Sequence, residues 1–394
     1  MYTDIAVLAA CIFLFRTIAG RVEKNIVSGP IIFIVVGFLL GPMGFEILSF
    51  KPSANIIKIL AELTLAIVLF NDAAGSNLSV LRKGSAIPTR MLIFGLPLVL
   101  LLGIGGGFVL FGNSLSLVEI AILATLLAPT DAALGQSVLK NNTVPSEIRQ
   151  GLNAESGLND GLCVPILFVF LIMATGESHD LGIEHLVLIL FAEELGLGLL
   201  VGVIITAVAW KLISYAGKSN NFPENWSQLT LAGAAVTSFS AAQSIGGSGF
   251  IAAFCGGLLF GYLAKEQRHQ LLSSSEGIGE LFSMITWILF GALICPSIQH
   301  ITWQMVCYAV LSLTVIRMLP IFVSLIGSKV SIKGRLFLGW FGPRGMATIV
   351  FTVIVMDSNL PSNSLIVTTA ALTIVSSVFL HGLTATPWAN RWKE

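Results

Sequence analysis

The sequence predicts an all-α polytopic membrane protein. Of its 394 residues, 55% are hydrophobic and only 11% are charged, and the mean hydropathy is +0.90, unlike the composition of a soluble globular domain. Long apolar runs recur along the chain, and they are continuous rather than alternating, which favours helices over the strands of a barrel. The 21 basic and 21 acidic residues cancel, so no net charge favours nucleic acid as a partner.

Thirteen stretches approach the roughly 20 apolar residues that a spanning helix needs. The first has no basic residue before it and no small-residue cleavage site after it, so we interpret it as a true span and not as a signal peptide. The predicted spans cover residues 3–20, 26–43, 56–74, 91–112, 116–139, 150–176, 184–213, 227–244, 246–263, 276–297, 302–326, 333–357 and 364–385.

The distribution of basic residues supports this count. With these spans, successive loops lie on alternate sides of the membrane. The loops and chain ends on one side hold sixteen Lys and Arg residues, and those on the other side hold only Lys51 and Lys58. The positive-inside rule then places the N-terminus outside and the C-terminus in the cytoplasm of a multi-pass protein of the inner (plasma) membrane. The remaining basic residues, Arg16, Arg317 and Arg344, fall within predicted spans.

Two segments of the chain resemble each other. Ser28–Gly41 and Ser248–Gly261 share six of fourteen residues at an offset of 220, although two Gly-rich apolar helices can also agree by chance. Spans five and twelve are both interrupted, by Ala128–Asp131 and Gly342–Gly345. We therefore expect a single membrane domain with inverted repeats at about 1–176 and 227–394, linked by the span 184–213. Inverted repeats with broken helices are typical of secondary transporters.

The two interruptions carry opposite charges. A proline frees backbone carbonyls, which are tolerated in a membrane only where they line a cavity or find a partner. Thr130 and Asp131 are expected to act as N-caps of the half-helix that follows them. Arg344 is expected to compensate the carbonyl end of a half-helix in its own span.

The segment Glu155–Asp160 is the densest polar cluster inside a span. A charge at the bilayer centre costs about 2.5–3.5 kcal/mol on insertion scales, so such residues are functional candidates. Ser156 and Asp160 lie four residues apart on one helical face, and Glu155 and Asn159 share the neighbouring stripe. Asp160 is the expected transport carboxylate, with a packing pair as the alternative, and Glu155 is expected in a structural ion pair.

Oxygen atoms in this region suit a monovalent cation, which we expect at Asp160, Ser156 and Thr130. Asp72, at the end of span three, is either a hydrated helix-end residue or a further ligand. Glu193 and Glu194 interrupt span seven and receive no role. The histidines fall at span ends or in loops and are interpreted as surface residues: His179, His185, His269, His300 and His381.

Other function classes find little support in the sequence. No phosphate-binding loop, cofactor motif or nucleophile–base pair occurs, so we expect neither an enzyme, nor an ATP-driven pump, nor a cofactor. The five cysteines are scattered without paired spacing, which argues against a metal site or a disulfide scaffold.

Several motifs form one combined pattern along almost the whole chain: Leu127–Asp131, Val144–Pro145 with Arg149, Glu155–Gly161, Gly247–Ala252, Gly342–Gly345 and His381–Leu383. This pattern resembles the NhaP/NHE-type monovalent cation:proton antiporters, the sodium/proton exchangers. The resemblance implies thirteen helices, a homodimer, a dimerisation domain and a moving core domain, and a role in ion transport and pH homeostasis. Ala132 replaces a proline that is frequent in the family, which leaves the local backbone path open.

The resemblance also implies roles for individual residues. Asp160 matches the carboxylate that binds either a cation or a proton, and Thr130 and Ser156 match cation ligands. The other matches are Asp131 and Asn159, which organise the crossed half-helices; Glu155, which pairs with an arginine, here Arg317; and Asp72, where many relatives carry an acid near the ion.

The expected activity is exchange of Na⁺ or K⁺, or Li⁺, for H⁺. Relatives with two adjacent acids at the site can carry a second proton, whereas the neighbour of Asp160 is the amide Asn159, so we expect electroneutral exchange. The alternatives are a sodium-coupled organic-solute symporter on the same broad fold and a cation channel. A symporter needs a larger, aromatic- or polar-lined cavity, and a channel needs a repeated filter sequence.

Overall fold

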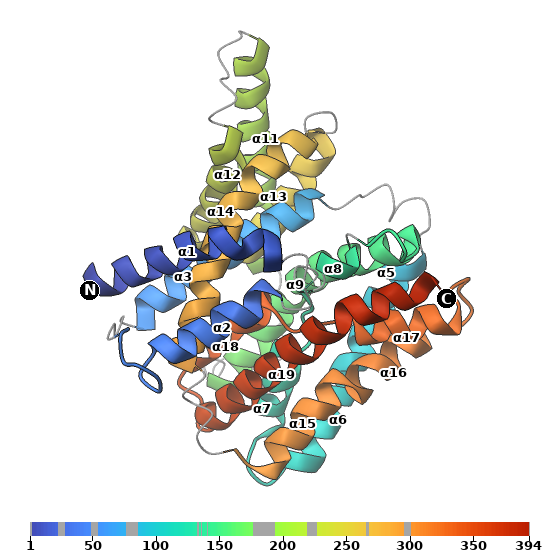
Figure 1. Ribbon diagram of the computed structural model, residues 1–394. Helices are drawn as coiled ribbons and strands as arrows, with labels where there is room; N and C mark the ends of the chain where they lie inside the picture. Colours follow the sequence, from blue (N-terminus) through green and yellow to red (C-terminus); the bar gives the residue numbers. More distant parts are fainter. Residues whose placement is uncertain are drawn as a thin grey trace. The chain divides into compact units, whose positions relative to one another are not determined.

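A computed structural model describes residues 2–22, 28–48, 54–75, 86–131, 134, 136–139, 141–175, 194–218, 227–264, 268–294 and 301–393. Within these ranges every regular element is a helix (Figure 1). The helices are α1 (Tyr2–Val22), α2 (Gly29–Leu40), α3 (Ala54–Gly75), α5 (Ala86–Arg90), η1 (Met91–Gly95), α6 (Leu96–Phe111), α7 (Leu117–Leu126), α8 (Gln136–Leu139), α9 (Ser146–Thr175), α11 (Gly196–Lys218), α12 (Ser227–Ser244), α13 (Gly249–Leu263), α14 (Arg268–Leu289), η5 (Phe290–Ile294), α15 (Trp303–Leu313), α16 (Val315–Ser324), α17 (Ile332–Trp340), α18 (Met346–Asp357), α19 (Asn363–Asn390) and η7 (Arg391–Lys393).

Six helical stretches in the described part of the chain are long and apolar enough to cross a membrane. They are Tyr2–Gly20, Ile87–Phe111, Ser146–Thr175, Gly196–Ala216, Trp303–Ser324 and Asn363–Asn390, and shorter apolar helices accompany them. The prediction of an all-helical, multi-pass membrane protein is therefore confirmed.

The chain divides into two compact units. One consists of Met1–Lys58, Ser85–Asn159 and Ser283–Glu394, and the other of Ile59–Gly84 and Asp160–Phe282. The first unit contains both interrupted helices, with the breaks at Ala128–Asp131 and Gly342–Gly345.

Glycines allow helices of the first unit to approach closely. Tyr308 of α15 is buried, and its hydroxyl donates a 3.1 Å hydrogen bond to the carbonyl of Gly103 in α6, which runs beside α15 in Figure 1. A Cβ at Gly107 would overlap the side chain of Ile120 in α7. Small residues are the usual means by which membrane helices bring their backbones together.

The second unit uses the same device. A Cβ at Gly257 of α13 would overlap the carbonyl of Phe70 in α3, and one at Gly261 would overlap the carbonyl of Ala74. Gly202 of α11 meets the backbone of Ala252 in α13 in the same way. Helix α13 is therefore held between α3 and α11 at backbone contact distance.

The predicted interruptions coincide with the ends of described helices. In span five, α7 ends at Leu126 and the next described α-helix starts at Gln136. In span twelve, α17 ends at Trp340 and α18 starts at Met346. At residues 127–131 and 341–345 the chain runs through non-helical, largely buried backbone, which requires partners for its polar groups.

Predicted span eleven, over 302–326, is present as the apolar stretch Trp303–Ser324. A turn at Thr314 divides this stretch into α15 and α16. The carbonyl of Ser312, two residues earlier, accepts a hydrogen bond from Arg344, which lies 32 residues away. The segment around Thr314 contains no glycine, and its only proline follows six residues later, so the local sequence does not predict this turn.

Candidate functional site: two interrupted helices and a buried polar network

The two interruptions meet directly. The amide of Asp131 donates a 2.8 Å hydrogen bond to the carbonyl of Pro343, and its Oδ2 accepts a 3.0 Å hydrogen bond from the amide of Met346. Met346 is the first residue of α18, where the partial positive charge of the helix favours an anion. A Cβ at Gly345 would overlap the Asp131 carboxylate, so this approach requires glycine.

Arg344 compensates the other interruption. Its side chain is fully buried, and Nη1 donates to the carbonyls of Ala128 and Pro129 at 3.1 and 3.2 Å. These carbonyls follow the C-terminal end of α7, where a cation is favoured. Nη2 donates to the carbonyl of Ser312 at 3.1 Å. One guanidinium therefore provides hydrogen bonds for three carbonyls at helix ends or breaks.

Both charges reach a helix end that the sequence does not predict for them. The Asp131 carboxylate caps α18, which belongs to the other interruption. The Arg344 guanidinium donates to the carbonyls that follow α7, in the first interruption. Each interruption therefore supplies a charge to a helix end of the other. Residues 132, 133 and 135 lie outside the described residues, so the expected capping of the helix after Asp131 stays a prediction.

Glu155 and Arg317 form a buried, two-pronged ion pair. Nη1 and Nη2 of Arg317 donate to Oε1 and Oε2 of Glu155 at 2.8 and 3.0 Å, and both side chains are 2% exposed. A Cβ at Gly342 would overlap the Arg317 guanidinium. Paired charges with additional hydrogen bonds are the form in which ionised groups persist in a protein interior.

Further bonds tie this pair to the first interruption. Asn159 donates its amide hydrogens to Glu155 Oε1 at 3.3 Å and to the carbonyl of Ala128 at 3.2 Å. The hydroxyl of Thr130 donates to Glu155 Oε2 at 3.2 Å, and the hydroxyl of Ser156 donates to the carbonyl of Thr130 at 2.6 Å. Glu155 therefore holds Arg317, Thr130 and Asn159 in one network.

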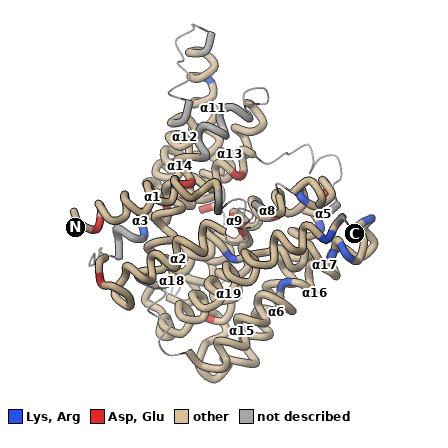
Figure 2. The backbone as a smooth tube through the Cα atoms, in the orientation of Figure 1, with Lys and Arg blue, Asp and Glu red and all other residues tan. Residues whose placement is uncertain are grey.

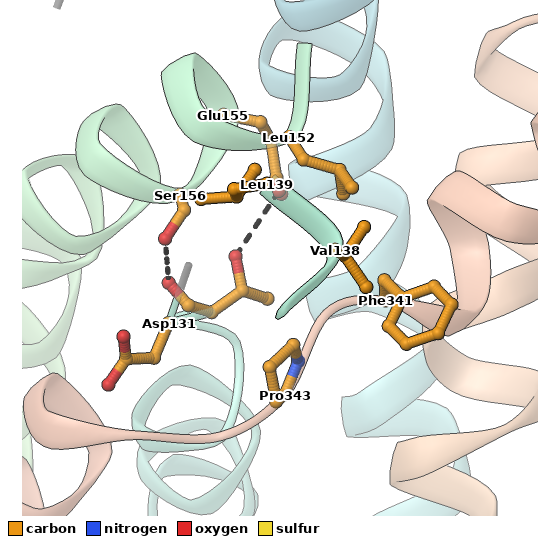
Figure 3. A pocket seen from close by; sticks show the side chains of 9 residues that line it. Asp131, Val138, Leu139, Leu152, Glu155, Ser156, Phe341 and Pro343 are labelled. Atoms are coloured by element: carbon orange, nitrogen blue, oxygen red, sulfur yellow. Dashed lines mark hydrogen bonds between the residues drawn. The ribbon is translucent and has the colours of Figure 1, made fainter. Parts of the chain in front are cut away.

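Figure 3 shows the small pocket that this network borders. Glu155 and Ser156 approach it from α9, and the extended segment of the second interruption forms the opposite wall. Thr130 and Ser156 use their hydroxyl hydrogens as donors, and hydroxyl oxygens are hard ligands of the kind that suits such cations. The pocket is lined by Thr130, Asp131, Val138, Leu139, Leu152, Glu155, Ser156, Phe341 and Pro343.

Asp160 lies in α9, four residues after Ser156, and is the first α9 residue of the second unit. Its side chain is buried, at 5% exposed. Asp72 lies in α3 of the same unit with an exposed side chain. Glu194 is half-buried just before α11, whereas Glu193 and residues 184–193 of predicted span seven lie outside the described residues.

The sequence analysis does not predict the contact between His381 and Ser377. His381 is predicted at the surface, but it is 2% exposed inside α19, and its Nδ1 lies 3.0 Å from the Ser377 hydroxyl. The four-residue spacing of a serine and a histidine within an apolar helix is the signal that could have found this pair. The prediction of exposure is wrong because His381 stands near the end of the apolar run, where hydropathy suggests a helix end.

An all-helical membrane protein in which two interrupted helices meet at mutually compensating charges has the architecture of a secondary transporter. The transmembrane model of the sodium/hydrogen exchanger family matches residues 6–391. The chain belongs to the sodium/hydrogen exchanger family.

Individual relatives agree with this family. The K⁺/H⁺ antiporter NhaP2 of Shewanella sp. strain ANA-3 is 25% identical over 387 residues, covering 98% of this chain and 66% of the relative. The K⁺/H⁺ antiporter NhaP of Alkalimonas amylolytica is 23% identical over 388 residues, covering 97% of this chain and 65% of the relative. The chain thus spans slightly less than two thirds of the length of these relatives.

The fold also matches a solved structure. The sodium proton antiporter MjNhaP1 of Methanocaldococcus jannaschii superposes with a TM-score of 0.80 over 99% of both chains, at 22% sequence identity. The expected all-helical fold of the NhaP antiporter type is therefore confirmed.

Proposed function

We propose that the chain is a secondary active antiporter that exchanges a monovalent cation for H⁺, with Na⁺, K⁺ and Li⁺ as the candidate ions. The observation that carries the proposal is the crossing of the two interruptions, in which Asp131 caps α18 and Arg344 caps the carbonyls after α7. The crossing brings buried oxygen atoms together. The residues that form it do not suit a redox metal or a phosphate. Membership of the exchanger family supports the same activity.

Asp160 is the proposed shared carboxylate for the cation and the proton. It is the buried acid of α9 one turn after Ser156, whereas Glu155 is occupied by Arg317. The hydroxyl oxygens of Ser156 and Thr130 are proposed as further cation ligands, and Asp131 and Asn159 as the residues that hold the interruptions in place. One carboxylate cannot hold both ions, so cation and proton compete and the cycle alternates between them.

Exchange is proposed to be electroneutral. The residue next to Asp160 is the amide Asn159, which cannot titrate, and both carboxylate oxygens of Glu155 are bonded to Arg317. One titrating carboxylate per protomer allows one proton to move for one monovalent cation. The ion gradients alone drive such a cycle, and it requires no cofactor.

The proposed membrane arrangement has thirteen crossings, with the N-terminus outside and inverted repeats at about 1–176 and 227–394. Figure 2 shows basic residues gathered where α5, α17 and the C-terminus lie, which fits a cytoplasmic face under the positive-inside rule. We further propose a homodimer in the inner (plasma) membrane, with a core domain that carries Asp160 between alternating access states. Asp72 is proposed as a helix-end acid close to the ion path.

A sodium-coupled organic-solute symporter is the second candidate on this fold. It is favoured less because the pocket beside Thr130 and Ser156 is small, and its lining residue Glu155 is already bonded to Thr130 and Arg317. A symporter would move a labelled organic solute with Na⁺ and would leave internal pH unchanged.

The test is exchange in proteoliposomes that contain the purified chain and a pH-sensitive dye. Outward gradients of Na⁺, K⁺ and Li⁺ are imposed in turn, with empty liposomes as the control. Antiport predicts internal acidification that depends on at least one of these cations. No cation-dependent pH change with any of the three ions would refute the proposal.

A further inference from the structure

The peptide group between Pro343 and Arg344 is held on both sides. Its carbonyl accepts the 2.8 Å hydrogen bond from Asp131, in the first interruption. Its N–H donates a 2.7 Å hydrogen bond to the hydroxyl of Ser377, in α19. Both Arg344 and Ser377 are fully buried, so water does not offer the N–H an alternative acceptor.

His381 extends this contact by one step. Its Nδ1 lies 3.0 Å from the Ser377 hydroxyl oxygen, one helical turn away. The ring packs against Trp340, the last residue of α17, with 5.1 Å between ring centroids. The indole N–H of Trp340 donates to Thr384 at 3.0 Å, which fixes the indole against α19. The imidazole is thus held by a turn of α19 on one side and the end of α17 on the other.

The direction of the hydrogen bonds follows from what each group can donate. The Arg344 N–H must donate, so the Ser377 oxygen accepts. The hydroxyl hydrogen of Ser377 then needs an acceptor, and Nδ1 of His381 supplies one when it carries no hydrogen. Nδ1 also lies 2.9 Å from the Ser377 carbonyl, to which a protonated Nδ1 would donate instead. The Nε2–H tautomer satisfies both the amide and the hydroxyl, and it leaves the buried Nε2–H without a hydrogen-bond partner among the described residues.

We propose that Ser377 and His381 are positioning residues for the crossing of the interruptions: His381 orients the Ser377 hydroxyl, and the hydroxyl fixes the Pro343–Arg344 peptide. The peptide in turn sets where the Arg344 guanidinium meets the carbonyls of Ala128 and Pro129. This inference rests on the proposed antiport for its transport readout, and it has a second readout that does not.

Without His381 the hydroxyl of Ser377 can form a different hydrogen bond. A serine inside a helix readily turns its hydroxyl to a carbonyl of the preceding turn of its own helix. That rotamer would move the oxygen away from Arg344 and leave a buried N–H without an acceptor. Removing the imidazole nitrogen should therefore have the same consequence as removing the hydroxyl itself.

The first test compares Ser377→Ala, His381→Phe and the double variant in proteoliposomes. His381→Phe keeps an aromatic ring beside Trp340 but removes the nitrogen. We expect each single variant to raise the KM for the transported cation about tenfold, the size expected for one lost buried hydrogen bond. The double variant should be no worse than either single one, because both act on the same bond.

Two control variants separate positioning from general packing. Thr373→Ala removes a hydroxyl one turn earlier in α19 that is equally buried but donates to the Thr369 carbonyl of its own helix. It should leave KM unchanged. Ser377→Thr keeps the hydroxyl and should stay within about threefold of the wild-type KM. Additive single effects, or an equal rise in KM for Thr373→Ala, would overturn the proposal.

The second test is hydrogen exchange of the Arg344 amide, followed by mass spectrometry on the detergent-purified chain. We expect exchange of this amide to accelerate at least about tenfold in Ser377→Ala and in His381→Phe, but not in Thr373→Ala. Unchanged protection in both variants would overturn the positioning role even where transport is altered. If the wild-type chain shows no antiport, the exchange data still decide this inference, because they do not depend on the proposed function.

Discussion

The carboxylate of Asp131 accepts a 3.0 Å hydrogen bond from the amide of Met346, so an acid in one interrupted helix caps the N-terminus of the other. In the opposite direction, Arg344 donates to the carbonyls of Ala128 and Pro129. The two interruptions are therefore coupled, because each supplies a charge to a helix end of the other. A change to either one is expected to disturb both.

Gly345 provides a direct test of this dependence. A Cβ at position 345 would overlap the Asp131 carboxylate, so Gly345→Ala should separate the interruptions, lower the Tm in detergent and abolish exchange. Overpacking of this kind typically costs about 1–3 kcal/mol. The measurements are thermal unfolding and proteoliposome exchange.

Gly233→Ala is the matched control for that variant. Gly233 lies in α12, and a Cβ there would meet nothing within 4 Å. In a helix, alanine is favoured over glycine by about 0.5–1 kcal/mol, so this variant should keep its Tm and its activity. If Gly345→Ala keeps the wild-type Tm and exchange rate, the crossing tolerates a side chain at this position. That result would contradict the close contact between Gly345 and Asp131.

The ion pair of Glu155 and Arg317 should be a major source of stability. Removing one member of a buried pair leaves the other uncompensated and typically costs about 3–5 kcal/mol. Arg317→Met should therefore lower the Tm clearly. Glu155→Leu should lower it further, because Thr130 and Asn159 also bond to Glu155.

The double variant Glu155→Leu/Arg317→Met distinguishes a paired charge from two independent side chains. It removes both charges together, so it should lose less stability than the sum of the two single variants. Strict additivity of the three unfolding measurements would count against the pair as the stabilising unit.

Transport is expected to be insensitive to voltage. A cycle that moves one proton for one monovalent cation carries no net charge, so the membrane potential does no work on it. The rate of Na⁺-driven pH change in proteoliposomes should stay constant when a potassium–valinomycin voltage is imposed. A several-fold rise in rate would mean that a further acid, such as Asp131, Asp72 or Glu155, exchanges protons during the cycle.

The interruptions themselves could be predicted from the sequence, because a proline close to a charged residue inside an apolar run both breaks the helix and places a costly charge in the membrane. Their pairing could not be predicted. The sequence assigns Asp131 and Arg344 each to a helix end close in the chain, and it does not predict that both side chains bond to the other interruption. Helix dipoles act over a single turn, so three-dimensional crossing decides which end is served.

Long-range contacts also account for the remaining differences between sequence and structure. The turn at Thr314 that divides span eleven lies close to a hydrogen bond from Arg344 to the Ser312 carbonyl. No local motif predicts this hydrogen bond. The burial of His381 depends on neighbours such as Trp340, which are distant in the chain. Hydropathy alone describes the chain's preference for lipid and does not describe which helices meet.

Asp160 is the one buried carboxylate proposed to bind the cation and the proton alternately, and its neutralisation tests the antiport mechanism most directly. The measurement is cation-dependent pH change in proteoliposomes containing Asp160→Asn, with Asp357→Asn as the control. Asp357 is a partly exposed acid paired with Lys58, and its loss should cost little. We predict that Asp160→Asn keeps the wild-type Tm and shows no cation-dependent proton movement, while Asp357→Asn transports normally. Sustained exchange by folded Asp160→Asn would contradict the assignment of Asp160 as the shared site.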